Sequence, residues 1–312
     1  MRLDVLSTIL TILGECDMVE LKGIIPYLVS PIKDDGCVDK KELTRLANDL
    51  IDQGVHGLCA LGSCGEFPYL TREQKVDIVS TVASVAFKAG IPSVAGVCGF
   101  SERQAIEEAK LFVSLGVDAI VLMMQSYFPL TDDMIVHFIR SVSAKVPNTQ
   151  IVLYSNPKYM HFQFSLGVFE GIKDCQNVNY YKDASGNTGF LMSLINKFGS
   201  RFKLFSASAH VPLFVFALGG VGWMAGPACV IAKQSVELYN LFNSGRMEEA
   251  MALQKKLWDV NRLFAKYDLT SSIKALLRYK GYAVGVPIAP IKDVSNEAYT
   301  ELCKVLDSIE EA

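Results

Sequence analysis

The sequence predicts an α/β protein, a (β/α)8 TIM barrel with a C-terminal helical extension. Its 312 residues suit one such barrel with additions, and 50% of them are hydrophobic, which is enough for a large core. Eight short apolar segments alternate with longer helical patterns, and only helical patterns follow the eighth. We therefore expect an N-terminal extension at 1–21, the barrel at 22–243 and a C-terminal helical segment at 244–312.

The expected strands are short apolar runs, and eight of them at this spacing favour a closed barrel over an open sheet. They cover residues 23–29, 57–62, 92–97, 118–124, 150–155, 178–183, 202–207 and 219–225.

The expected helices carry start and stop signals. Thr71 is an N-cap with Gln74 in the capping-box position. A second helix begins at Ser101 and ends at Gly116, and an earlier one ends at Gly54. Beyond the eighth strand, further helices are expected near 228–243, 246–266, 270–280 and 295–309.

Charge and composition disfavour several function classes. The formal net charge is −3 and no block of basic residues stands out, so nucleic acid is not an expected partner. No apolar run reaches the roughly 18 residues of a membrane span. The short run at 5–13 predicts a peripheral amphipathic helix, or a gene start extended upstream of Met18; a signal peptide is the less favoured alternative. The eight cysteines form no CxxC pair, which indicates reduced thiols in a cytoplasmic protein.

Lys182, in "YYKDASGN", ends the sixth expected strand, where barrel enzymes carry their chemistry. One interpretation is a lysine that reaches solvent and pairs with Asp183. The other is a desolvated amine with a lowered pKa, which can attack a keto carbon and form an imine. The protonated imine would then draw electrons from the adjacent C–C bond without a metal.

Two other strand ends offer binding and proton-transfer groups. In "GSCGEF", the turn through Ser63, Cys64 and Gly65 can hold a carboxylate with backbone N–H groups, or can be a plain tight turn. Tyr154 lies at the end of the fifth expected strand. It is either a core residue or a proton shuttle for a nearby amine. Trp223, in the last strand, lines the pocket or fills the barrel. The four histidines fit no metal-binding spacing, so no metal is expected and a metal-dependent aldolase is disfavoured.

These motifs, in this order, resemble those of the dihydrodipicolinate synthase / N-acetylneuraminate lyase family, class I pyruvate-dependent aldolases on a (β/α)8 barrel. "GSCGEFPYLTREQ", "LYSNP", "YYKDASGN" and "GGVGWMAGPA" carry the resemblance, which spans roughly residues 22 to 308. The resemblance implies that Lys182 forms a Schiff base with pyruvate or a related 2-oxo acid and that Tyr154 relays protons. It places Ser63 and Cys64 at the two positions that hold the carboxylate. It further implies an aldehyde as partner substrate, no cofactor, and a homotetramer arranged as a dimer of dimers.

Several positions depart from the family pattern. Cys64 stands where the synthase has Thr, and Tyr159 stands where it has an arginine for the second substrate's carboxylate. Ser126, with Tyr127 beside it, stands where the synthase has a tyrosine that reaches across a dimer interface. The stretch ending at Ser208 lacks the acidic residues of the sialic acid lyase. Lysine biosynthesis and sialic acid cleavage are therefore both disfavoured.

The expected substrate-binding residues also include a set for the second part of the substrate. "YSNPKYMHFQF" is similar to the corresponding stretch of hydratase-aldolases that act on aryl-substituted pyruvates, and Trp223 and Met224 suit an apolar tail. Ser126, Tyr127 and Ser208 complete this set. The sequence thus predicts a Schiff-base aldolase or lyase. The alternatives are dihydrodipicolinate synthase proper and a non-catalytic barrel that binds a keto acid.

Overall fold

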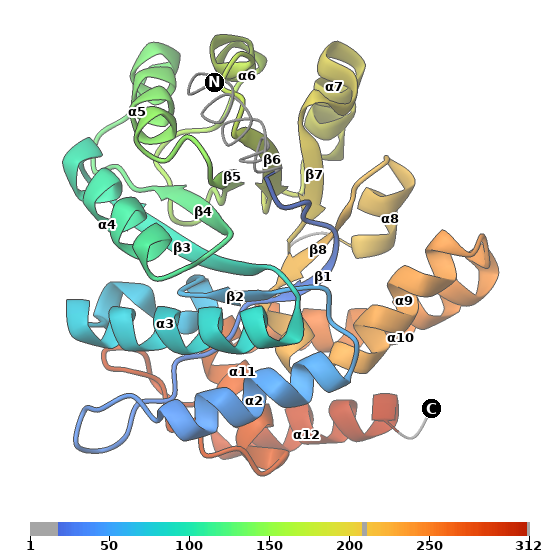
Figure 1. The fold of residues 1–312 in the computed structure, drawn as a ribbon. Helices are drawn as coiled ribbons and strands as arrows, with labels where there is room; N and C mark the ends of the chain where they lie inside the picture. Colours follow the sequence, from blue (N-terminus) through green and yellow to red (C-terminus); the bar gives the residue numbers. More distant parts are fainter. Residues whose placement is uncertain (1–17, 208–210, 311–312) are drawn as a thin grey trace, which may run out of the picture.

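The computed structural model describes residues 18–207 and 211–310. Within these residues, eight parallel strands form one sheet in the order β1-β8-β7-β6-β5-β4-β3-β2. A parallel bridge between Tyr27 and Cys59 joins its two ends, and the N–H of Leu28 donates to the Cys59 carbonyl at 2.9 Å. The sheet therefore closes, and the predicted (β/α)8 barrel is confirmed (Figure 1).

All eight expected strands are present, most of them shorter at their ends than the apolar runs. They are β1 (Gly23–Pro26), β2 (Leu58–Ala60), β3 (Ser93–Gly99), β4 (Ala119–Met124), β5 (Gln150–Ser155), β6 (Val178–Asp183), β7 (Lys203–Ser206) and β8 (Gly222–Ala225). Nearly every strand residue is buried, because helices cover the outer face and side chains fill the inner one.

The helices begin and end close to the predicted signals. Thr71 and Gln74 form the capping box at the start of α3 (Arg72–Ala89). The Ser101 side chain accepts a hydrogen bond from the backbone at the start of α4 (Glu102–Ser114). The helices are α2 (Lys40–Asp52), α3 (Arg72–Ala89), α4 (Glu102–Ser114), α5 (Asp132–Lys145), α6 (Leu166–Ile172), α7 (Thr188–Phe198), α8 (Pro212–Ala217), α9 (Ala232–Asn243), α10 (Met247–Tyr267), α11 (Leu269–Tyr279) and α12 (Asn296–Glu310). A 3-10 turn, η1 (Ser63–Gly65), follows β2.

The C-terminal helices pack against the barrel along the side formed by β1, β2 and α2 (Figure 1). Arg45 of α2 donates to the Gly281 carbonyl at 3.1 Å, and the Tyr282 hydroxyl donates to Asp49 at 2.9 Å. Helix α11 is buried almost around its whole circumference, from Thr270 to Leu277. A helix buried on all sides lies inside a core rather than on its surface.

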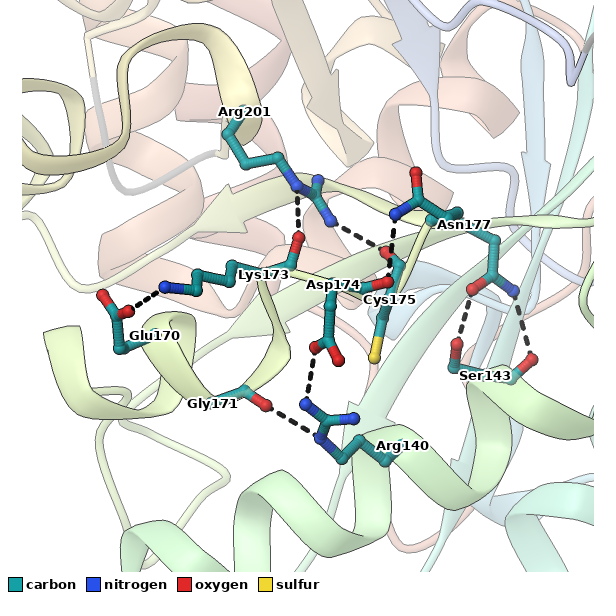
Figure 2. Close-up of polar contacts among 10 residues, drawn as sticks. Arg140, Ser143, Glu170, Gly171, Lys173, Asp174, Cys175, Asn177 and Arg201 are labelled. Carbon is teal, nitrogen blue, oxygen red and sulfur yellow. Dashed lines mark hydrogen bonds and ion pairs between the residues drawn. The ribbon is translucent and has the colours of Figure 1, made fainter.

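Two arginines form hydrogen bonds that link neighbouring segments at the amino-terminal end of the barrel (Figure 2). Arg201 donates to the backbone carbonyls of Lys173, Cys175 and Val178 at 2.8–2.9 Å, at the end of α6 and the start of β6. Arg140 of α5 donates to the Gly171 carbonyl at 2.8 Å and pairs with Asp174. These contacts lie at the face of the barrel opposite to the strand ends where chemistry is expected, so we assign them to stability.

Two further observations concern the described residues as a whole. None of their helices has both the length and the apolar character that a membrane crossing requires. Nor do residues 18–207 and 211–310 contain a group of three or more His, Cys, Asp or Glu side chains that could hold a metal ion.

Candidate active site

Lys182 and Tyr154 lie side by side at the carboxyl ends of β6 and β5. The two residues are register partners in the sheet. The Lys182 Nζ atom lies 3.7 Å from the centre of the Tyr154 ring and 4.0 Å from the centre of the Tyr27 ring. Lys182 is only 2% exposed, which excludes the interpretation in which it reaches solvent.

Burial lowers the pKa of Lys182 to about 7, because the barrel interior removes water from the charged ammonium. Three nearby groups, Cys59, Cys64 and Asp183, favour the ammonium but do not overcome this desolvation. The two tyrosine rings give a protonated Lys182 some compensation through cation–π contact. The amine is thus neutral in a large fraction of molecules near neutral pH, as a nucleophile must be.

The hydroxyl of Tyr154 is hydrogen-bonded and protonated. Its hydroxyl accepts a hydrogen bond from the Asn156 side chain at 2.8 Å. Burial raises the pKa of Tyr154 well above its usual value, so the hydroxyl keeps its proton and can donate it. The Tyr27 hydroxyl is also fully buried and has no hydrogen-bond partner within the described residues. The rings of the two tyrosines flank the Lys182 amine.

The turn after β2 presents two free donors, as expected for a carboxylate site. The N–H groups of Ser63 and Cys64 begin the 3-10 turn and donate to no atom of the described residues. The carbonyls of the turn face away: Gly65 accepts from the Ser30 hydroxyl at 2.6 Å. Successive N–H groups of this kind bind anions. Burial raises the pKa of the Cys64 thiol to about 12, so the thiol is neutral and adds no negative charge there.

Two cavities of about 120 and 160 Å³ adjoin Tyr154 at the barrel mouth. Both are lined by Ser63, Tyr154, Asn156, Tyr159 and Asp268. The smaller cavity continues into an apolar wall made of Phe67, Pro68, Met123, Met124, Met160 and Ile291. The larger one continues toward α10 and includes Lys158, Asn261 and Phe264.

Apart from Ser63 and Tyr154, none of the predicted site residues that the structure describes lines either cavity, and this includes Lys182. Trp223 and Met224 of β8 are fully buried and line neither cavity. Ser126 and Tyr127 lie on the loop after β4, where the Ser126 hydroxyl donates to the Phe128 carbonyl and Tyr127 is 79% exposed. Ser208 lies outside the described residues. A role for these five residues in substrate binding stays a prediction.

Sequence reasoning missed several residues that surround this site. Tyr27, which directly follows β1, contacts Lys182, although the stretch "GIIPYLV" predicts only an apolar strand. Asp268, which precedes α11, lines both cavities. Lys274 of α11 forms a fully buried ion pair with Glu66. The sequence signal for this ion pair was Glu66, an acidic residue within "GSCGEF", whose other residues are small or apolar.

Comparison with known proteins shows the family of this chain. The model of the dihydrodipicolinate synthetase family matches residues 20–309. The 4-hydroxy-tetrahydrodipicolinate synthase of Prochlorococcus marinus is 29% identical over 288 residues, which cover 92% of this chain and 94% of that protein. A second such synthase, from Halalkalibacterium halodurans, is 28% identical over 86% of this chain and 91% of its own length.

A solved structure gives the same result. The dihydrodipicolinate synthase of Bacillus anthracis superimposes with a TM-score of 0.88 at 25% identity, over 93% of this chain and 99% of that one. The match extends through the barrel and the C-terminal helices, and the family model spans the turn after β2, Tyr154 and Lys182. The chain therefore belongs to the dihydrodipicolinate synthetase family and is an enzyme of that family of pyruvate-dependent Schiff-base lyases.

Proposed function

We propose that Lys182 forms a Schiff base with C2 of pyruvate or a related 2-oxo acid. The enzyme then makes or breaks a C–C bond, or eliminates water, next to that carbon. The observation that carries this proposal is a 2% exposed amine with a pKa of about 7, in contact with the Tyr154 ring at the carboxyl end of a barrel strand.

The proposed chemistry divides between three groups. The neutral Nζ atom of Lys182 adds to the keto carbon, and the carbonyl oxygen leaves as water after proton transfer. Tyr154 delivers and removes these protons, since its ring packs directly against the amine. The N–H groups of Ser63 and Cys64 hold the carboxylate. The positively charged imine then acts as the electron sink, so the proposal requires no cofactor.

The wall of the smaller cavity favours an aldehyde with an apolar substituent as second substrate. Met123, Met160 and Phe67 form that wall, and no Lys or Arg is among the described residues that line it. Tyr159 occupies the position at which the family resemblance expects an arginine. Lys158 lines the neighbouring cavity but is exposed, and the Lys274 ammonium is already paired with Glu66. A second substrate with its own carboxylate would therefore lack a buried partner.

An aldehyde panel tests this preference. We would measure kcat/KM for pyruvate addition to benzaldehyde and butyraldehyde, against aspartate semialdehyde. The expected result is a higher kcat/KM for the two neutral aldehydes. The reverse order would support dihydrodipicolinate synthase proper, whose second substrate carries a carboxylate.

We also propose a cytoplasmic homotetramer. The aromatic side chains of Tyr127 and Phe128, 79% and 70% exposed, contact each other on the loop after β4. Exposed aromatic pairs of this kind are typical of protein interfaces. Light scattering on the purified protein should give four times the mass of the chain; a monomer at micromolar concentration would contradict this assembly.

Borohydride trapping tests the central proposal. The protein is incubated with pyruvate, reduced, digested and mapped by mass spectrometry. A reduced pyruvyl adduct is expected on Lys182 and should be absent in Lys182→Ala. Lys203→Ala is the matched control, because Lys203 of β7 pairs with Glu20 outside the site. Failure of the folded protein to form an adduct with pyruvate or longer 2-oxo acids would contradict the proposal.

Assays on the same purified protein distinguish this proposal from two alternative functions. A non-catalytic keto-acid-binding barrel would bind pyruvate but show no turnover with any aldehyde. A metal-dependent aldolase would lose its activity in EDTA and keep it in the Lys182→Ala variant.

A further inference from the structure

A fully buried ion pair joins the turn after β2 to the C-terminal helices. Lys274 of α11 and Glu66 are 0% and 1% exposed, and their Nζ and Oε2 atoms lie 2.5 Å apart. The other carboxylate oxygen of Glu66 accepts the N–H of Ile288 at 2.6 Å, and Lys274 also donates to the Val286 carbonyl at 3.0 Å. Burying two charges is costly unless each is paired and hydrogen-bonded in this way.

Glu66 is held in a conformation that it would not adopt without such partners. Its φ angle is +55°, in the left-handed region that non-glycine residues rarely enter. It directly follows Gly65, and its own N–H closes the 3-10 turn on the Ser63 carbonyl at 3.3 Å. The direction in which the free N–H groups of Ser63 and Cys64 point therefore depends on how Glu66 is fixed.

Helix α11 also approaches the turn at two other points. The Thr270 hydroxyl lies 3.5 Å from the Ser63 carbonyl. Ile273 and Cys64 both lie close to Gly226, so the two side chains share one packed region. Asp268, which caps α11 by accepting the N–H of Ser271 at 3.0 Å, lines both cavities. The C-terminal segment thus forms one wall of the site.

We propose that Lys274 is a positioning residue for the keto-acid carboxylate: through Glu66 it fixes the turn whose Ser63 and Cys64 N–H groups bind that carboxylate. The inference rests on the proposed function. It separates carboxylate binding from the chemistry of the amine, since Lys182 and Tyr154 stand on β6 and β5 and neither takes part in the ion pair.

Lys274→Met tests the inference, with borohydride trapping as the readout. Losing well-aimed N–H donors to a carboxylate should raise the pyruvate concentration for half-maximal trapping by about tenfold or more. The maximal rate of trapping should stay close to that of the wild type, because Lys182 and Tyr154 are both retained. A merely structural role would lower the amount of folded protein without changing half-saturation.

A double variant and a matched control complete the test. Glu66→Gln with Lys274→Met removes both charges, so no unpaired charge is left buried and the protein should fold. It should show the same raised half-saturation. Lys280→Met is the control, because Lys280 follows α11 directly but pairs with Glu310 at the surface.

The outcomes also separate this inference from the proposed function. Wild-type half-saturation in folded Lys274→Met, or in the double variant, would overturn the positioning role while leaving the Schiff-base proposal intact. Absence of an adduct in the wild-type protein would instead remove the proposed function, and the inference with it.

Discussion

Lys182 and Tyr154 are register partners on neighbouring strands, and the lysine amine lies 3.7 Å from the centre of the tyrosine ring. Parallel strands place the carboxyl ends of β5 and β6 at one edge, so a lysine and a tyrosine that are distant in the sequence come into contact. The ring shields the amine from water, and this desolvation lowers the pKa of the amine to about 7.

The first prediction concerns the pH dependence of imine formation. Only the neutral amine is nucleophilic, so the rate of adduct formation at low pyruvate should rise with pH, with a midpoint near 7, and level off above it. Rapid-quench borohydride trapping between pH 5 and 10 measures this profile. A midpoint above 9 would show an ordinary lysine instead.

The second prediction concerns stability. Between pH 7 and 10.5 the unfolded lysine holds a proton that the folded one has lost, so the penalty for burying Lys182 decreases as pH rises. Lys182→Met should therefore raise the free energy of unfolding by about 3–5 kcal/mol at or below pH 7, with a gain that shrinks toward pH 10. Urea unfolding of both proteins at several pH values measures the difference. A gain that is independent of pH would contradict the depressed pKa.

The third prediction separates proton transfer from imine formation. Tyr154→Phe keeps the ring over Lys182 but removes the hydroxyl that accepts from Asn156. Turnover should fall by about 10²–10⁴-fold, the usual contribution of a general acid–base group, while some adduct still forms. Steady-state kinetics and trapping on the same sample test both halves. A loss below threefold would count against the role of this hydroxyl.

The fourth prediction concerns the contact between Cys64 and Gly226. A β-carbon on Gly226 would lie 2.1 Å from the Cys64 Sγ atom, so Gly226→Ala should overpack the site and cost about 1–3 kcal/mol of stability. Cys64→Ala removes that sulfur and should recover part of the loss in the double variant. Unfolding free energies of the four proteins form a double-mutant cycle. Strict additivity would mean that the two residues are not coupled.

The fifth prediction concerns the opposite face of the barrel. Arg201→Ala removes donors to the backbone carbonyls of Lys173 and Cys175 (Figure 2) and of Val178, and should lower the free energy of unfolding by about 1–3 kcal/mol. The kcat and KM values should stay as in the wild type, since Arg201 lies at the amino ends of the strands. Thermal unfolding and steady-state kinetics together test this. A raised KM would indicate that the network reaches the site.

The sequence by itself determined the barrel and its central residues. Eight apolar runs separated by capped helices specify parallel strands, because each run is buried on both faces and each helix must cross back over the sheet. Lys182 and Tyr154 lie side by side because both stand at the ends of parallel strands that are neighbours in the sheet. The helix starts at Thr71 and Ser101 could also be predicted, because an N-cap depends on hydrogen bonds to backbone groups only three residues away.

Only the tertiary structure decided what surrounds these residues. Tyr27 faces Lys182 because the sheet closes between β1 and β2, and Lys274 meets Glu66 although they lie far apart in the chain. The pKa of Lys182 depends on how completely its neighbours exclude water, which no local pattern reports. Sequence fixes which side chains are available at each strand end, whereas packing between distant segments fixes their contacts, hydration and charge.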